Sequence, residues 1–311
     1  MRFGPCATRE AEGALLAHSV TAGRRYPKAH RLSAADIADL LAAGVTEVIV
    51  AVLDEHDMDE DAAATRLAAT IDAPHVEPRP AATGRVNLYA AADGLFLVDK
   101  DAVDALNAVD PAITLATLAD KVAVEKGRMV ATVKIIPFAV ASERVEAACA
   151  VLRAQPCFEV RPFEARRTAL IQTVLPGLKD SVLSKTRRVT EARLARSGST
   201  VGEEARCAHE AGAVAEAIRT ALRSHDMAIV FGASALCDFD DVIPAAIRQA
   251  GGAVERAGMP VDPGNLLVLG KVSGKVVLGA PGCARSPKEN GFDWVLDRLL
   301  AGLDLTSADI G

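Results

Sequence analysis

The sequence predicts an α/β protein, in which a mixed α+β region over 1–164 is followed by a three-layer, mostly parallel sheet over 165–311. Three observations lead to this prediction. The chain has 311 residues, which exceeds the usual size of a single domain. Its residues are 50% hydrophobic but only 4% aromatic, so small aliphatic side chains must fill a core of closely packed helices and sheets. After residue 165, apolar runs alternate with helical patterns, which is typical of parallel strands joined by right-handed crossovers.

The N-terminal region opens with a predicted helix between Ser33 and Gly44, which have the chemistry of an N-cap and a C-cap. The β-branched stretch that follows, 46–53, is predicted to be a strand. The acidic run 54–61 is predicted to begin the next helix, where its carboxylates would complement the helix dipole. The proline-rich stretch 73–84 then marks a break, which would divide this region into two subdomains.

Between this break and the second domain, the patterns predict further strands and helices. The strands are expected at 85–91, 94–99 and 129–140, and the helices at 100–109 and 142–154. Pro137 should interrupt the last strand or place it at a sheet edge. Ser142 has the chemistry to cap the helix that follows.

The second domain is predicted to alternate strands with helices. Strands are expected at 168–174 and 227–232 with a hairpin over 265–282, and helices at 181–198, 207–225, 241–252 and 291–303. The hairpin should turn at Ser273 and Gly274. In sheets of this kind, ligands bind beyond the carboxyl ends of the strands. The loops that follow 168–174, 227–231 and 275–279 are therefore the expected ligand site.

Charge, cysteine content and hydropathy exclude several classes of function. The formal charge of −6 argues against a nucleic-acid partner, which requires a concentrated basic face. No apolar run approaches the ~20 residues that cross a bilayer, so no membrane contact is expected. The six cysteines form no CxxC pair and the six histidines no HxH or HExxH motif, so neither a disulfide framework nor a metal cage of His and Cys is expected. The chain is predicted to be cytoplasmic.

The first of the three loops places Asp180 and Ser181 after a Pro-Gly turn, at the start of a predicted helix. Free backbone amides and the helix dipole favour an anion at such a position. The alternative is that one of these two side chains only caps the helix.

The second loop is rich in small residues and aspartates. Gly232 and Ala233 let a ligand approach the backbone, and Ser234 can donate to a phosphate. Asp238 and Asp240 can hold Mg²⁺ through water, or accept hydrogen bonds from a ligand ring. The alternative is a surface loop with an ordinary helix cap. The sequence has neither a GxGxxG nor a GxxxxGK[ST] motif, which argues against the common dinucleotide and P-loop sites.

The third loop region combines two Pro-Gly turns with basic and small polar residues. Its candidate binding residues are Pro263, Gly264, Asn265, Pro281, Gly282, Cys283, Arg285, Ser286 and Lys288. Two cations and several small donors suit an oxyanion. The alternative is an ordinary turn with a solvated basic rim. Cys283 is either a reactive thiol or a packing residue, and packing is the expectation.

At these loops, the region 165–302 resembles the molybdopterin-binding domain of two molybdenum cofactor biosynthesis enzymes, molybdopterin adenylyltransferase and molybdopterin molybdotransferase. The stretches "FGASALCDFDDV", "VDPGN" and "GAPGCARS" follow one another as the corresponding molybdotransferase motifs do. Gly232 and Asp240 match the glycine and the aspartate of the first motif. The Pro-Gly pairs at 263–264 and 281–282 match those of the other two motifs, and the serine of the last motif is also present.

The resemblance implies that the second domain binds molybdopterin or adenylyl-molybdopterin. The loop after 227–231 would cradle the phosphate together with the two Pro-Gly turns. Asp240, aided by Asp238, would hold Mg²⁺ or the pterin, and these two residues with Asp180 are the expected catalytic carboxylates. Arg285 and Lys288 would supply the compensating positive charge.

Two functions follow from the resemblance. The chain would be a transferase of nucleotidyl groups or molybdate, acting through the placement of phosphates and Mg²⁺. The second hypothesis is a non-catalytic carrier, chaperone or sensor of the cofactor. The altered motif supports it, since Ala233 and Asn265 replace a glycine and a lysine of the family motifs. A homo-oligomer is also implied, with other cofactor-biosynthesis enzymes or molybdoenzymes as partners. The start of the chain, 10–52, more weakly resembles the amino-terminal region of the molybdotransferase.

Overall fold

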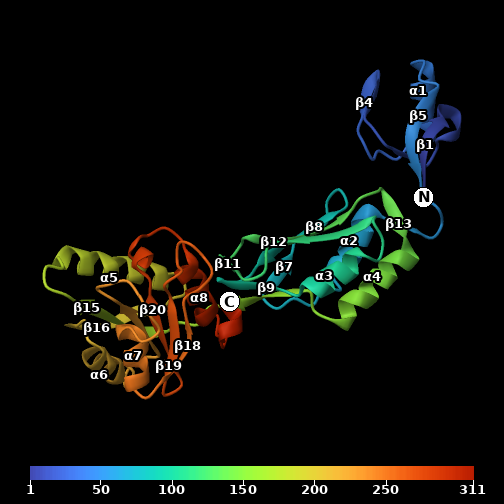
Figure 1. Cartoon of the computed structure of the whole chain (residues 1–311). Helices are drawn as coiled ribbons and strands as arrows, with labels where there is room; N and C mark the ends of the chain where they lie inside the picture. Colours follow the sequence, from blue (N-terminus) through green and yellow to red (C-terminus); the bar gives the residue numbers. More distant parts are fainter. The chain divides into compact units, whose positions relative to one another are not determined.

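The computed structural model describes all residues from 1 to 311, which fold into two compact units. Figure 1 labels the helices and strands. The first unit comprises Met1–Ala91, Phe96–Asp120 and Lys126–Val160, and the second comprises Ala92–Leu95, Lys121–Glu125 and Arg161–Gly311. The chain is a mixed α/β structure with several separate sheets. No helix combines the length and the apolar character that a bilayer crossing requires.

The first unit begins with a small three-stranded sheet of order β1-β5-β2, accompanied by a two-stranded ribbon and one α-helix. These elements are β1 (Arg2–Ala7), η1 (Thr8–Glu10), β2 (Leu15–Leu16), β3 (Val20–Ala22), β4 (Arg24–Tyr26), α1 (Ala34–Ala42) and β5 (Glu47–Val52). Ser33 caps α1, because its hydroxyl accepts from the amide of Asp36 while the Asp36 carboxylate accepts from the amide of Ser33. The helix predicted between Ser33 and Gly44 and the strand predicted at 46–53 are confirmed.

The predicted helix starts near the end of the acidic run 54–61, at Glu60, so its first turn contains only the last two acidic residues of the run. Asp59 caps it by accepting from two backbone amides of the first turn. Asp54 and Asp57 instead bind the N-terminal amino group, each at 2.7 Å. These two carboxylates are therefore engaged by a nearby full charge rather than by the helix dipole.

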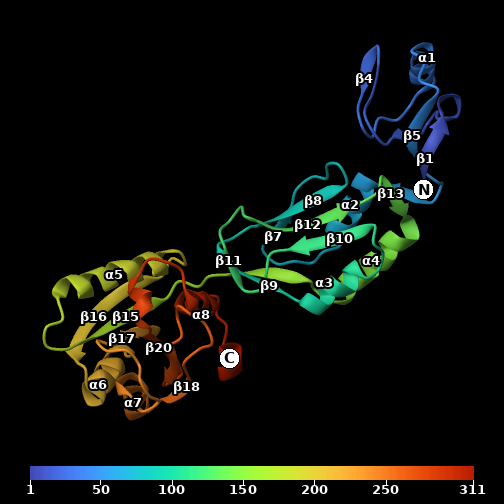
Figure 2. The ribbon, with the colours of Figure 1, turned by 45° about the horizontal axis from the view of Figure 1, so that its top comes forward.

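A four-stranded antiparallel sheet of order β10-β12-β8-β7 forms the centre of the rest of the first unit (Figure 2). The elements around it are β6 (Asp57–Asp59), α2 (Glu60–Ala68), β7 (Val76–Pro78), β8 (Arg85–Ala90), α3 (Lys100–Asn107), β10 (Ile113–Thr117), β12 (Met129–Ile135), β13 (Ala139–Ala141) and α4 (Ser142–Ala154). Helix α2 packs on β8 and β12, α3 packs on β10, and α4 packs against both helices. A further sheet of order β11-β9-β14 contains β9 (Gly94–Val98), β11 (Val122–Val124) and β14 (Phe158–Pro162).

The predictions for Pro137 and Ser142 in this part of the chain have different outcomes. The strand predicted at 129–140 is interrupted around Pro137, since β12 ends at Ile135 and β13 begins at Ala139. The prediction that Ser142 caps α4 is wrong. Ser142 is the first residue of the helix, and the helix has no side-chain cap.

The second unit is built on a six-stranded sheet of order β16-β15-β17-β20-β19-β18. Its strands are β15 (Arg167–Val174), β16 (Thr200–Ala208), β17 (Met227–Phe231), β18 (Ala253–Ala257), β19 (Val268–Val272) and β20 (Lys275–Ala280). The pairings from β16 to β20 are parallel, whereas β19 runs antiparallel to both β20 and β18. The sheet is therefore mixed. The hairpin predicted at Ser273 and Gly274 is confirmed, and both residues have the positive φ that such a tight turn requires.

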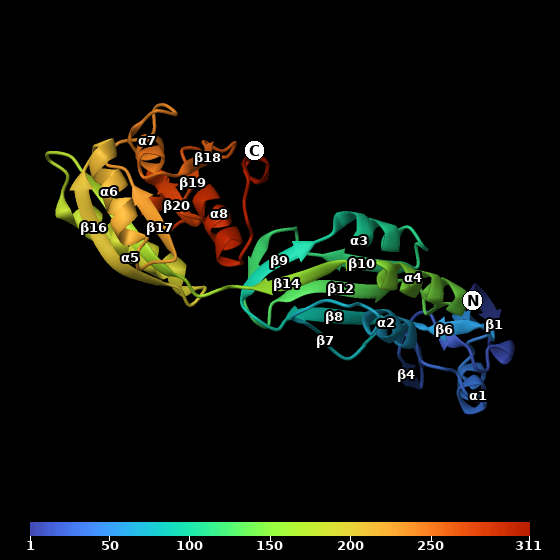
Figure 3. The ribbon, with the colours of Figure 1, turned by 90° about the horizontal axis from the view of Figure 1, so that it is seen from below.

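The helices of the second unit lie on both faces of this sheet (Figures 1 and 3). They are α5 (Asp180–Ala195), α6 (Ala211–Ala221), α7 (Val242–Gln249) and α8 (Gly291–Leu300). One hydrophobic cluster joins Leu170 and Ile229 of the sheet to α5 and α8, and the other joins Ile171 and Val230 to α6 and α7. Side chains therefore alternate between two cores along each strand. The helix predicted at 207–225 begins later because its first residues belong to β16, a strand that the sequence did not suggest.

Candidate functional site

The second unit contains a small cavity beyond the carboxyl ends of its parallel strands. Its volume is about 150 Å³. The lining residues are His209, Gly232, Ala233, Ser234, Ala235, Leu236, Asp241, Ile243, Leu266, Val268, Ala280, Pro281, Gly282 and Arg285. The loops after β17 and β20 both contribute, because these strands are parallel neighbours and end at the same edge of the sheet. Six of the predicted binding residues lie here, namely Gly232, Ala233, Ser234, Pro281, Gly282 and Arg285.

Gly232 allows the chain to turn tightly where β17 ends. A Cβ atom at this position would lie 2.9 Å from the carbonyl oxygen of Ser234 and 3.7 Å from Cε1 of His209. The first of these distances is too short for a side chain to fit unless the loop shifts. The shape of this wall of the cavity therefore depends on glycine.

Arg285 brings a positive charge to the cavity. Its guanidinium donates to the carbonyl oxygen of Gly232 at 3.0 Å, to the side-chain oxygen of Gln172 at 3.5 Å and to the hydroxyl of Thr186. It also lies over the ring of Phe231, with Cζ 5.0 Å from the ring centroid. All three acceptors are neutral, and burial lowers the pKa of Arg285 because desolvation disfavours its charged form. A half-buried cation with neutral acceptors favours an anionic ligand beside it.

His209 follows β16 and lines the same cavity. Its Nδ1 lies 2.9 Å from the hydroxyl oxygen of Thr173, which also accepts a hydrogen bond of 2.6 Å from the amide of Ala233. Thr173 is fully buried at the end of β15. This chain of hydrogen bonds holds the histidine ring at the ends of β15 and β17.

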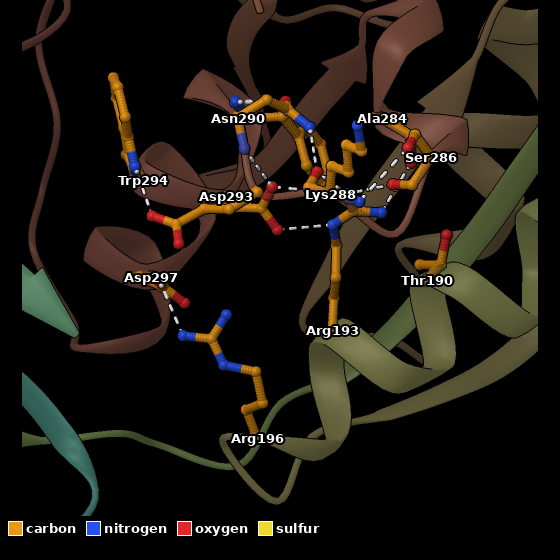
Figure 4. Close-up of polar contacts among 12 residues, drawn as sticks. Thr190, Arg193, Arg196, Ala284, Ser286, Lys288, Asn290, Asp293, Trp294 and Asp297 are labelled. Atoms are coloured by element: carbon orange, nitrogen blue, oxygen red, sulfur yellow. Dashed lines mark hydrogen bonds and ion pairs between the residues drawn. The ribbon is translucent and has the colours of Figure 1, made fainter. Parts of the chain in front are cut away.

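Arg193 of α5 fixes the loop after β20 (Figure 4). Its Nε donates to Asp293 Oδ1 at 2.6 Å, and its two Nη atoms donate to the carbonyl oxygens of Ala284 at 2.6 Å and Ser286 at 2.7 Å. The side chains of Arg193 and Asp293 are only 7% and 5% exposed. Asp293 also accepts from the amide of Asn290, the residue that caps α8. One buried guanidinium, whose planar fork suits several acceptors, thus joins α5, this loop and α8.

The predicted turn Pro263–Gly264–Asn265 packs on the start of α8 and does not line the cavity. The carbonyl oxygen of Pro263 accepts from the amide of Gly291 at 3.1 Å. A Cβ atom at Gly264 would lie 2.9 Å from the backbone of Gly291, so the two glycines let the backbones approach closely. The carbonyl oxygen of Asn265 accepts from the amide of Met259 at 2.9 Å.

Asp238 and Asp240 lie on the exposed part of the loop after β17 and do not line the cavity. Asp240 Oδ1 accepts from Arg248 at 2.9 Å, with the Asp240 side chain 86% exposed. Asp238 accepts from the amide of Asp240 at 2.8 Å. Their neighbour Asp241 does line the cavity, where both its carboxylate oxygens accept from backbone amides and it caps α7.

The Mg²⁺ assignment to Asp238 and Asp240 does not fit the geometry. No group of three or more His, Cys, Asp or Glu side chains is arranged to hold a metal ion. Mg²⁺ takes a nearly octahedral set of oxygen ligands. These two carboxylates are exposed and already bind a backbone amide and the guanidinium of Arg248.

The predicted residues Asp180 and Ser181 lie in the exposed first turn of α5. Asp180 pairs with Arg206 at 3.2 Å, and its side chain is 89% exposed. The capping alternative for these residues is wrong, because the N-cap residue is Lys179 and no side chain caps the helix.

Ser286, Lys288 and Cys283 support the loop after β20 and do not line the cavity. Ser286 and Lys288 offer backbone carbonyl oxygens to Arg193. The Sγ atom of Cys283 lies 3.9 Å from Oδ1 of Asn290. Burial raises the pKa of Cys283, which disfavours the reactive thiolate and agrees with a packing role.

Three residues of this region escaped the sequence analysis: His209, Thr173 and Arg193. His209 falls inside the helix predicted at 207–225, whereas in the structure it directly follows β16, so no loop was expected there. Thr173 is a buried hydroxyl in an otherwise apolar strand, and that exception to the pattern was the available signal. Arg193 lies at helical spacing from the buried residues Thr186 and Thr190, so a charge on the buried face was its signal.

Comparison with known proteins gives one partial family match. The family described as "Domain of unknown function (DUF8806)" matches residues 5–52. No curated protein matches the chain.

Comparison with solved structures gives several distant similarities. The molybdopterin biosynthesis MoeA protein from Pyrococcus horikosii is 15% identical with a TM-score of 0.34, over 82% of this chain and 81% of that one. The CinA protein of unknown function from Thermoplasma acidophilum is 16% identical with a TM-score of 0.33, over 39% of this chain and 90% of that one. A molybdenum cofactor biosynthesis protein from Pyrococcus furiosus is 11% identical with a TM-score of 0.28, over 96% of this chain and 64% of that one. Similarity at this level assigns neither an activity nor a ligand.

Proposed function

We propose that the domain over 165–311, with a three-layer fold of the molybdopterin-binding type, binds molybdopterin or adenylyl-molybdopterin as a molybdenum cofactor biosynthesis protein. The observation that carries the proposal is the cavity beyond β17 and β20. There the motif residues Gly232, Pro281 and Gly282 lie beside the guanidinium of Arg285. Small residues give an anion access to the backbone, and the cation lacks a carboxylate partner among its hydrogen-bond acceptors.

The size of the cavity determines which part of the ligand it holds. Sites that enclose a whole drug-sized molecule have volumes of roughly 300–1,000 Å³. A cavity of about 150 Å³ suits the phosphate end of the ligand, while the pterin lies outside. The loop after β17 also carries the exposed carboxylates of Asp238 and Asp240, which we propose accept hydrogen bonds from the ring. Mg²⁺ enters only as a companion of the ligand's own phosphates.

A non-catalytic carrier, chaperone or sensor is the form of this function that the ion pairs favour. Two of the carboxylates expected to be catalytic are paired with arginines, Asp240 with Arg248 and Asp180 with Arg206. Asp180, Asp238 and Asp240 also lie outside the lining of the cavity, where a nucleotidyl or molybdate transferase would need them to place phosphates and Mg²⁺. We propose a cytoplasmic homo-oligomer that passes the cofactor between biosynthesis enzymes and molybdoenzymes.

The first experiment is mass spectrometry of the small molecules that co-purify with the native full-length protein. A pterin or its nucleotide form is the expected result. Calorimetric titration with molybdopterin, with and without ATP and Mg²⁺, then separates the two forms of the function. Stoichiometric binding without release of pyrophosphate or consumption of molybdate indicates a carrier, and turnover indicates a transferase.

Arg285→Met tests the cavity directly, with Arg219→Met as the matched control. Arg219 is an arginine on α6 that pairs with Glu216 at the surface and does not line the cavity. We expect the first variant to lose most of the molybdopterin affinity and the second to bind as the wild type does. Equal binding by all three proteins would contradict the proposed site.

A further inference from the structure

His209 shares the cavity with Arg285, and the two side chains approach the same residue. The guanidinium of Arg285 donates to the carbonyl oxygen of Gly232 at 3.0 Å. A Cβ atom at Gly232 would lie 3.7 Å from Cε1 of His209. The only hydrogen bond of the imidazole is made by Nδ1, so Nε2 is available to a ligand.

The hydrogen bonds of Thr173 determine which nitrogen of His209 carries the proton. The Thr173 oxygen accepts from the amide of Ala233, so its own proton needs an acceptor, and Nδ1 of His209 is the one within reach. Because the hydroxyl is fully buried, leaving that proton without an acceptor would cost free energy. This arrangement makes Nδ1 an acceptor and leaves Nε2 as the nitrogen that carries the ring proton.

A second proton on His209 would change the hydrogen bonds and the charge of the cavity in two ways. Nδ1 would then become a donor, and the hydroxyl of Thr173 would lose its acceptor. The new charge would also share the cavity with the cation of Arg285, whose acceptors are all neutral. An anion with two negative charges offsets the second change because it attracts both cations, and Nε2–H donates to it in either protonation state.

The other charged group that lines the cavity is Asp241. Its two oxygens accept from the amides of Cys237 at 2.9 Å and Val242 at 2.6 Å, at the start of α7. The helix dipole and these amides stabilise its negative charge. The neighbours of His209 along the chain on either side, Ala208 and Glu210, do not line the cavity. Among the lining residues, His209 is thus the side chain whose type changes charge between about pH 5 and 8.

We propose that His209 and Arg285 bind one tetrahedral dianion, such as a phosphate monoester, and that His209 takes up a proton when the anion binds. The inference deepens the proposed function, on whose cavity it rests. A volume of about 150 Å³ admits one such group but not a whole nucleotide. The ligand therefore carries a terminal monophosphate. Its affinity depends on pH because His209 takes up a proton when the ligand binds.

The test is calorimetric titration of the full-length protein with sulfate, a tetrahedral anion whose charge stays at −2 over the pH range used. For the wild type, we expect sulfate to bind about tenfold more tightly at pH 6 than at pH 8, because a histidine gains its proton in that interval. Titrations at pH 7 in buffers of different ionisation enthalpy should show net proton uptake on binding.

Two variants and one control complete the experiment. His209→Gln replaces the imidazole by a side-chain amide, which can donate a hydrogen bond but cannot gain a proton, so its sulfate affinity should be the same at both pH values, with no proton uptake. His209→Asn serves as a second variant if the first perturbs the loop, and the circular dichroism of each is compared with that of the wild type. His18→Gln, at an exposed histidine in the first unit, should retain the wild-type pH dependence.

The outcomes separate this inference from the proposed function. Sulfate binding with the same pH dependence in wild type and His209→Gln would overturn the role of His209 and leave the anion site standing. Equal sulfate binding by wild type and Arg285→Met, or none by the wild type at either pH, would overturn the anion site itself and the proposed function with it.

Discussion

Replacing Arg193 by methionine should destabilise the second unit by about 3–5 kcal/mol, the usual cost of removing one partner of a buried ion pair. The magnitude follows from the contacts. Arg193 and Asp293 are almost fully buried, and the guanidinium also serves the carbonyl oxygens of Ala284 and Ser286. Methionine fills similar space, so the loss in free energy of unfolding measures the contribution of the charge and its hydrogen bonds. Asp293 would retain only the amide of Asn290 as a hydrogen-bond donor.

The single tryptophan of the chain, Trp294, provides the assay. It lies on α8 directly after Asp293, so its fluorescence reports the unfolding of the second unit by urea. Arg219→Met is the control, because its surface ion pair should contribute no more than about 1 kcal/mol. A double-mutant cycle with Asp293→Asn then isolates the interaction between Arg193 and Asp293.

A loss in the free energy of unfolding for Arg193→Met no greater than that for Arg219→Met would contradict this role of Arg193. So would a cycle that gives no coupling between Arg193 and Asp293, since groups 2.6 Å apart in a buried pair must interact. In that case water or a rearranged loop would replace the guanidinium at little cost.

Three further predictions concern pH, the exposed loop and the cavity wall. Burial raises the pKa of Asp297 from its ordinary value of 3.8 to about 6. The protonated carboxyl therefore contributes its full stabilisation below pH 3.8, and this stabilisation is lost as the pH rises through 6. Relative to Asp297→Asn, the free energy of unfolding of the wild type should fall by up to about 3 kcal/mol between pH 4 and pH 7, measured by Trp294 fluorescence in urea. Asp240→Ala should abolish ligand retention in co-purification but lower the melting temperature little, because its pair with Arg248 is exposed; retained ligand with a collapsed fold would mark Asp240 as structural. Gly232→Ala should weaken sulfate binding at least tenfold in calorimetry, because the new methyl group would displace the loop, and unchanged affinity would show that the loop adapts.

The fold features that the sequence predicted correctly depend on local chemistry. The N-cap at Ser33 and the tight turn at Ser273 and Gly274 each involve residues no more than a few positions apart, so their signals are complete within a short window. Strand β16 was missed because it lies at the edge of its sheet. Its side chains are largely polar and partly exposed, so it lacks the apolar run that identifies a buried strand.

The candidate site was predictable only in part. The loops after β17 and β20 could be expected at one edge, because parallel strands align their carboxyl ends. The roles of Arg193 and His209 could not, because they depend on partners far away in the chain. Arg193 binds residues 91 to 100 positions later, and His209 binds a hydroxyl 36 positions earlier. Side-chain contacts over such separations leave no periodic pattern in the sequence.

The parallel pairing of β15 with β17 and of β17 with β20 also determines when the cavity can form during synthesis. Leu170 lies beside Ile229, and Ile229 beside Leu278, so each contact must close a long loop before it contributes stability. The hairpins and ribbons of the first unit join segments much closer in the chain. The cavity beyond β17 and β20 is therefore assembled late. Its lining is complete only after Arg285 has been made and the last parallel strand has docked.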